Sequence, residues 1–89
     1  MKMKMKTKYK YHTDPGHGWI AVKRAELIRL NILNEITPWS YQKGKTVYLE
    51  EDCDANIFQK AKRIHKEKIE IINSYRDYTP IRNYESFAI

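Results

Sequence analysis

The first ten residues alternate between lysine and a non-basic residue, which is the two-residue period of a β-strand. This pattern predicts a strand over residues 3–12, with residues 1–5 forming a basic arm that frays at the chain end. A row of lysines on a strand also prevents edge-to-edge association, so it has a structural explanation beside any functional one. The lysines of this row are Lys2, Lys4, Lys6, Lys8 and Lys10.

A chain of 89 residues can close one hydrophobic core, so residues 1–89 are predicted to form a single domain. Hydrophobic residues make up 42% of the chain, a composition that excludes a disordered protein. The sequence has no apolar run of about 18 residues, so no transmembrane helix and no membrane partner are expected. The lack of a signal-peptide apolar segment and the single cysteine, Cys53, predict a protein of the reducing cytoplasm.

A turn and a short apolar strand follow the lysine row. Residues 14–18 combine Asp, Pro and Gly as in a β-turn, and residues 19–22 are apolar. The strands 3–12 and 19–22 are therefore predicted to form a hairpin. Residues 24–30 are rich in helix formers and predict a helix of about two turns, ended by Asn31 in the left-handed conformation.

The second half of the chain predicts another hairpin and a long helix. Residues 39–41 and 46–49 flank the turn residues 42–45. The acidic run 50–54 marks a helix start with Asp52 or Asp54 as N-cap, because the helix dipole favours negative charge there. This helix is predicted to extend to Ser74, and residues 77–89 to form an extended aromatic tail. Its buried stripe would comprise Phe58, Ala61, Ile64, Ile69, Ile72 and Tyr75.

The predicted element order is β-β-α-β-β-α followed by the tail. It indicates a small single α+β domain with a mostly antiparallel sheet of about four strands, one long C-terminal helix and helices on one face of the sheet.

Four separated motifs resemble small accessory proteins of tailed bacteriophages. They are the run 14–19, the pair 40–41 ahead of a glycine turn, the run 48–55 and the run 80–84. The resemblance covers most of residues 11–84 and leaves out the lysine row. It implies a phage origin without assigning an activity. Small phage proteins of this size often inhibit a host defence such as a toxin–antitoxin system, a restriction enzyme or a CRISPR effector.

The charge of the chain is unevenly distributed. Residues 1–24 carry a net charge of +6, residues 25–59 of −3 and residues 60–89 of +3. Basic residues interleaved with aromatic ones are typical of surfaces that bind single-stranded nucleic acid. The alternative is a solvated strand and a solvated helix face over core tyrosines. The candidate nucleic-acid-binding residues are Lys2, Lys4, Lys6, Lys8, Lys10, Tyr9, Tyr11, Lys43, Lys45, Lys60, Lys62, Arg63 and Lys66.

A second set of residues would suit contact with a protein. Trp39, Tyr78, Arg82 and Tyr84 are of the types that anchor protein interfaces. Arg82 has two interpretations: it pairs with the acidic run 50–54 and locks the tail, which is favoured, or it faces a partner. A homodimer remains open.

His12, Asp14 and His17 lie within six residues and would suit a metal site or a two-histidine nuclease. A metal site would need a further ligand, for which Asp52, Cys53, Asp54 and His65 are available. A tight turn with a surface histidine explains the group more simply. No catalytic residue, metal or cofactor is therefore predicted.

The sequence thus favours a non-enzymatic phage accessory protein of the host cytoplasm that binds RNA or another nucleic acid and inhibits a host defence complex. The alternatives are an inhibitor that binds a host defence protein directly and, less favoured, a small nuclease.

Overall fold

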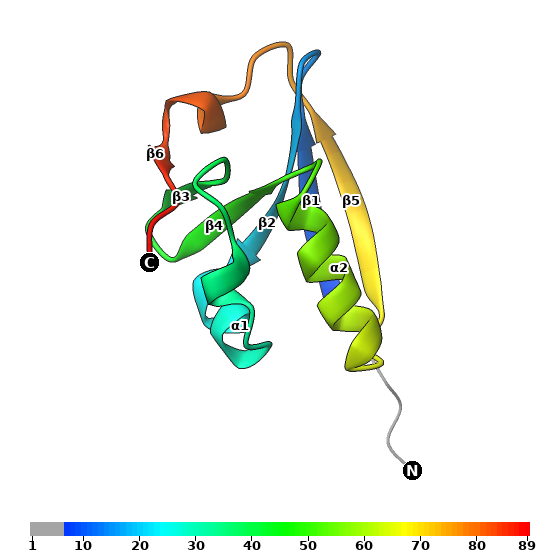
Figure 1. Ribbon diagram of the computed structural model, residues 1–89. Helices are drawn as coiled ribbons and strands as arrows, with labels where there is room; N and C mark the ends of the chain where they lie inside the picture. The colour runs from blue at the N-terminus through cyan, green and yellow to red at the C-terminus, as the bar shows by residue number, and fades with distance from the viewer. Residues whose placement is uncertain (1–6) are drawn as a thin grey trace.

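The alternating sequence at the start of the described chain forms strand β1 (Thr7–Thr13), which pairs with β2 (Gly18–Lys23) in the first predicted hairpin (Figure 1). The computed structural model describes residues 7–89, so the predicted contacts of Lys2, Lys4 and Lys6 lie outside the described residues. The second predicted hairpin is formed by β3 (Tyr41–Lys43) and β4 (Thr46–Glu50).

The described residues form an α+β fold with one six-stranded mixed sheet. Its strand order is β5-β1-β2-β4-β3-β6, and β5 runs parallel to β1 whereas all other neighbours are antiparallel. Neither α-helix of the described chain is long and apolar enough to cross a membrane. The remaining elements are α1 (Arg24–Arg29), the 3₁₀ turn η1 (Leu33–Glu35), α2 (Asp54–Ile64), β5 (Ile69–Tyr75), the 3₁₀ turn η2 (Pro80–Asn83) and β6 (Glu85–Ser86).

The core lies between the sheet and the two α-helices, which share one face of the sheet (Figure 1). Alternate residues of the central strands point into it, and Leu27 of α1 and Phe58 of α2 are completely buried against them. The opposite face of the sheet carries no α-helix, and we call it the open face. The core residues of β2 and β4 are Ile20, Val22, Val47 and Leu49.

The predicted long C-terminal helix is wrong, because α2 ends after 11 residues. Lys66 follows the helix with a φ of +58°. The N–H of Lys66 bonds to the carbonyl of Arg63 and that of Glu67 to the carbonyl of Lys62, which is a Schellman ending built on lysine instead of glycine. The β-branched residues that follow then pair with β1 as strand β5. Of the predicted buried stripe, Phe58 and Ala61 are buried and Ile69 is half-buried, whereas the prediction is wrong for Ile64, Ile72 and Tyr75, which are exposed.

The predicted number of about four strands is also wrong, because β5 forms in the segment expected to be helical and the segment expected to be a tail adds β6 to the edge of β3. The N–H of Phe87 donates to the carbonyl of Ser40 at 2.8 Å. Ile81 and Phe87 of this segment are buried, whereas Tyr78 is exposed. The tail is therefore part of the sheet.

The end of α1 is predicted correctly. Asn31 has a φ of +60°, and its N–H bonds to the carbonyl of Ile28. The N–H of Ile32 bonds to the carbonyl of Leu27, so this helix also ends in a Schellman motif.

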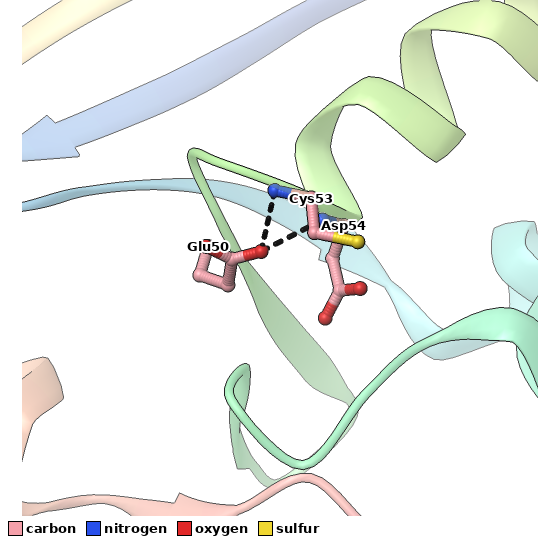
Figure 2. A group of neighbouring side chains, drawn as sticks. All are labelled: Glu50, Cys53 and Asp54. Atoms are coloured by element: carbon pink, nitrogen blue, oxygen red, sulfur yellow. Dashed lines mark hydrogen bonds between the residues drawn. The ribbon is translucent and has the colours of Figure 1, made fainter.

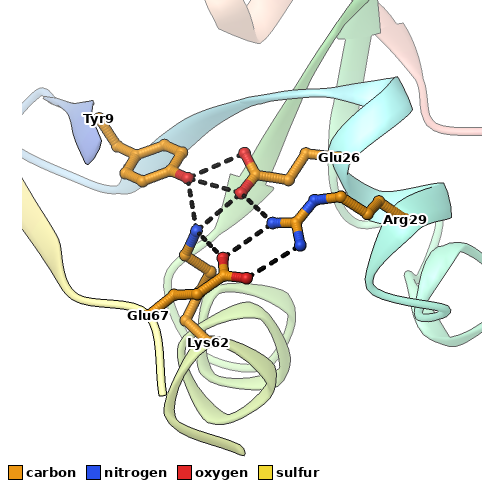
Figure 3. Close-up of polar contacts among 5 residues, drawn as sticks. All are labelled: Tyr9, Glu26, Arg29, Lys62 and Glu67. Atoms are coloured by element: carbon orange, nitrogen blue, oxygen red, sulfur yellow. Dashed lines mark hydrogen bonds and ion pairs between the residues drawn. The ribbon is translucent and has the colours of Figure 1, made fainter. Parts of the chain in front are cut away.

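A buried lysine joins α2, α1 and β1 (Figure 3). The Nζ of Lys62 donates to Glu26 and to Glu67, each at 2.8 Å, and to the hydroxyl of Tyr9 at 2.9 Å. Burial alone would lower the pKa of Lys62, but its hydrogen bonds to Glu26, Glu67 and Tyr9 outweigh this and raise it. Arg29 closes the network with bonds to both carboxylates. The interior charge is thus fully paired.

Removing the charge of Lys62 should destabilise the fold strongly. Lys62→Met keeps most of the aliphatic stem but removes the buried cation and leaves Glu26 and Glu67 with the exposed Arg29 alone, so we expect a loss of about 3 kcal/mol in the free energy of unfolding. Lys60→Met, on the exposed side of the same helix, should change it by less than about 0.5 kcal/mol. Urea unfolding of both variants measures the difference, and equal stabilities would contradict the structural role of the network.

Acid should weaken the same network. Hydrogen bonds from Arg29 and Lys62 lower the pKa of Glu67 to about 2 from an ordinary value of 4.5. The stability that this ionised carboxylate contributes is complete above pH 4.5 and is lost as the pH falls through about 2. Glu67→Gln should therefore flatten the acid limb of a plot of unfolding free energy against pH. Glu70→Gln, which removes an exposed carboxylate, should leave that limb unchanged.

Candidate nucleic-acid interface

The sheet separates the predicted basic residues into two groups. Lys8 and Lys10 lie on the open face, because Tyr9 between them points into the core. The second group, which we call the helix group, is carried by α2 and the turn after it. It lies on the outer side of α2, and α2 covers the opposite face of the sheet. The strand and helix groups therefore do not meet in one surface. The exposed members of the helix group are Lys60, Arg63 and Lys66.

Three predicted contact residues point towards the protein interior instead. Lys62 and Tyr9 are 2% and 6% exposed and bond to each other. Tyr11 is half-buried, and its hydroxyl donates to Glu51 at 3.2 Å. These side chains support the fold and leave the candidate surface to other residues.

A groove of about 480 Å³ lies between β1 and β2 on the lysine side. The two strands pair directly only from Tyr11–Ile20 to Thr13–Gly18, and the groove opens beyond that point. Lys8, Lys10 and Lys23 line it, together with His12 and Tyr48. The chain thus places three ammonium groups beside two rings.

The electrostatic environment of this groove is positive. Burial lowers the pKa of His12, and the positive charges of Lys10 and Arg76 lower it further. Glu26 also borders the groove, but its carboxylate is paired with Lys62. The groove therefore suits an anionic ligand.

Aromatic side chains continue from the groove across the open face. The ring of Tyr48 contacts those of His12 and Tyr84, with centroid distances of 5.9 and 5.3 Å. The Nζ of Lys43 lies 4.8 Å from the centroid of the Tyr84 ring. Thr46 faces Lys23 on one side and Lys43 on the other, so the basic row extends over β2, β4 and β3. Lys45 is exposed on the adjoining turn.

Lys23, Tyr48 and Arg76 are not among the contact residues predicted from the sequence. The sequence could have indicated Lys23, because it lies four residues after Trp19 and therefore on the same face of the strand. The positions of Tyr48 and Arg76 depend on which strands become neighbours.

An ion pair holds the C-terminal segment to the other end of the open face. Arg82 donates to both carboxylate oxygens of Asp14, with Nε and Nη2 each 2.6 Å from an oxygen. These bonds, and those from the N–H groups of Gly16, His17 and Thr79, hold the pKa of Asp14 well below its usual range. The expected pairing of Arg82 with the run 50–54 is therefore wrong, because Asp14 takes its place. The locking role of Arg82 is as predicted.

This ion pair also bears on the nuclease alternative. The carboxylate of Asp14 is occupied by Arg82, and the side chain of His17 faces Glu51 at 3.6 Å. Within residues 7–89, His12, Asp14 and His17 do not form a group with metal-ligand spacing. The Asp-Pro-Gly segment is a turn in which Asp14 accepts hydrogen bonds from two backbone N–H groups.

A different group, Glu50, Cys53 and Asp54, brings ligand atoms within 4.8 Å of one another (Figure 2). Glu50 uses this position to cap α2, because its carboxylate accepts the N–H groups of Asp52, Cys53 and Asp54. The expected N-cap, Asp52 or Asp54, is thus replaced by Cys53, and Glu50 supplies the capping bonds. Asp54 is fully buried and accepts three hydrogen bonds from Thr37 and Ser40 on one oxygen. Capping accounts for Glu50 and loop attachment for one oxygen of Asp54, whereas its other oxygen, Oδ1, is buried without a hydrogen-bond partner among the described residues.

The predicted partner-binding residues divide into two pairs. Arg82 and Tyr84 are engaged within the protein, by Asp14 and by Tyr48. Trp39 is 78% exposed and Tyr78 58% exposed. Trp39 and Tyr78 therefore remain candidates for contact with a protein.

Comparisons with protein-family models, curated proteins and solved structures find no match for this chain. The resemblance to phage accessory proteins stays a prediction.

Breaking the ion pair should release the C-terminal segment. Arg82→Lys retains a positive charge but loses the two-pronged geometry, so we expect faster amide hydrogen exchange in residues 79–87 and a lower Tm. Arg76→Lys changes an exposed arginine nearby and should affect neither. Unchanged exchange in Arg82→Lys would show that β6 and the buried Ile81 hold this segment without the ion pair.

Proposed function

We propose that this protein binds single-stranded RNA on the open face of its sheet and acts without catalysis. The observation that carries the proposal is the groove that Lys8, Lys10 and Lys23 line together with His12 and Tyr48. Phosphate contacts supply most of the affinity of such complexes, whereas exposed rings stack with unpaired bases.

The charge on this face supports contact with a phosphate backbone. Lys8, Lys10 and Lys23 are exposed, so their ammonium groups are hydrated and accessible to a ligand. Lys43 extends the row towards β3. An RNA strand that follows this row would cross the sheet strands, as in known complexes between sheet surfaces and single-stranded RNA.

The rings favour a single strand over a duplex. Tyr48 and His12 lie in the sheet surface, where a base can reach them only if it is unstacked from its neighbours. Both α-helices cover the other face of the sheet (Figure 1), and α1 reaches the groove only through Glu26, whose carboxylate is paired with Lys62, so neither lies along the groove as a recognition helix would. Shape therefore argues against major-groove reading of DNA.

The biological role that we propose rests on the sequence motifs alone. A phage accessory protein that binds RNA in the host cytoplasm would act on a host defence complex that contains RNA, or on one that it reaches through RNA. The proposal does not depend on which defence system this is.

The test compares two double variants with the same net charge. Lys8→Gln with Lys10→Gln removes two cations from the open face, whereas Lys60→Gln with Arg63→Gln removes two from the outer side of α2. The first should weaken binding to a fluorescent 12-nucleotide RNA and lower the slope of log affinity against log salt by about 1.4. The second should leave that slope nearly unchanged.

Fluorescence anisotropy at four or more salt concentrations gives both slopes. Equal losses in the two double variants would mean that only net charge matters, and the open-face site would be rejected. A salt-independent affinity of the unmodified protein would reject phosphate binding altogether. Tighter binding to a duplex of the same sequence would contradict the single-strand preference.

A further inference from the structure

A second concave site lies at the other end of the open face, where α2 begins. This hollow has a volume of about 530 Å³ and is distinct from the basic groove, with which it shares no residue. Three aromatic side chains and two carboxylates line it, together with His17, Cys53 and Arg82. These five side chains are Trp19, Trp39, Tyr41, Glu50 and Asp52.

Trp39 is the accessible ring of the hollow, and the fold holds its turn in place. Although the side chain of Trp39 is 78% exposed, its N–H donates to the hydroxyl of Thr37 at 3.2 Å. That hydroxyl and the hydroxyl of Ser40 both donate to the buried carboxylate of Asp54. A fully buried aspartate therefore anchors a turn that presents tryptophan to solvent. An exposed tryptophan on a fixed backbone is typical of a binding anchor.

The charge of this hollow is opposite to that of the groove. Asp52 contributes an exposed carboxylate, whereas the carboxylate of Glu50 is occupied by N–H groups at the start of α2. The single guanidinium, that of Arg82, is already neutralised by Asp14. A phosphate group would be repelled here, whereas a cation would be attracted.

Beside this hollow, an aromatic ring and a carboxylate already hold one cation of the chain itself. Arg82 lies with its guanidinium carbon 5.5 Å from the centroid of the Trp19 ring while both its donors bind Asp14. Trp39 and Asp52 offer the same two elements, a ring and a carboxylate, on the accessible side of the hollow. A flat guanidinium stacks on an aromatic ring and binds a carboxylate at the same time, which an ammonium does less well.

We infer that this hollow binds an arginine side chain of a protein partner, with the guanidinium stacked on Trp39 and paired with Asp52. The site is independent of the RNA-binding proposal, because it uses other residues and the opposite charge. With both sites, the open face would hold an anionic strand at one end and a basic segment of a protein at the other.

The test uses two blocked heptapeptides that differ in one residue. One carries a central arginine among glycines and serines, and the other carries citrulline, which has nearly the same shape but no charge. The chain has two tryptophans, so a ¹⁵N NMR spectrum shows two indole N–H signals, and Trp39→Phe identifies that of Trp39. The arginine peptide at millimolar concentration should shift the Trp39 signal, and the citrulline peptide should not.

Two variants with matched controls locate the contact. Asp52→Asn should weaken binding of the arginine peptide about fivefold, and Trp39→Ala should weaken it at least as much. Glu70→Gln and Ile28→Ala, which alter an exposed carboxylate and an exposed apolar side chain elsewhere, should bind as the unmodified protein does. Because all four side chains are exposed, the variants should fold, and far-UV circular dichroism checks this.

Three results would overturn the inference. They are no shift with the arginine peptide, equal shifts with both peptides, and an Asp52→Asn affinity equal to that of Glu70→Gln. Asp52→Asn should leave binding of the 12-nucleotide RNA unchanged. The RNA-binding proposal and the arginine-binding inference can therefore be rejected independently of each other.

Discussion

The buried ammonium of Lys62 is the interaction on which the rest of the structure depends. Its three hydrogen bonds join the end of α2 to α1 and to β1, at the point where the chain leaves the helix for β5. A charge at this depth is tolerated only while its partners are in place. The network therefore favours one arrangement of the helices on the sheet. It also holds Glu67, the residue directly after the left-handed Lys66 at which the chain reverses direction. The parallel pairing of β5 with β1 follows from that reversal.

The pairing order then gives the open face its polarity. Antiparallel neighbours place Lys23 and Thr46 at one end of the central strands, and Trp19 and Glu50 at the other. The basic groove and the acidic aromatic hollow are consequently at opposite ends of one surface. The C-terminal segment, held by Arg82 on Asp14, borders the hollow. The uneven charge distribution along the sequence thus becomes a surface with one basic end and one acidic end.

Much of the first half of the fold could be predicted from local patterns. The alternation before Thr13, the turn at Asp14 and the left-handed Asn31 each depend on neighbouring residues in the chain. The long helix was wrong for a tertiary reason. The helix ends at the left-handed Lys66, and the β-branched residues after Glu67 pair with β1 as strand β5. The sixth strand escaped prediction because two residues are too short to show a period.

By itself, the sequence determined the α+β class, both hairpins, the α1 ending and the residue types of a basic and aromatic surface, because these follow from periodicity, turn chemistry and composition. Only the tertiary structure decided which residues share that surface. It buried Lys62 and Tyr9, moved the helix cations to the far side of the sheet, and brought Lys23 and Tyr48 beside Lys10. The partner of Arg82 was decided in the same way. Contacts between residues far apart in the chain depend on strand order, and strand order is set by the packing of the whole core.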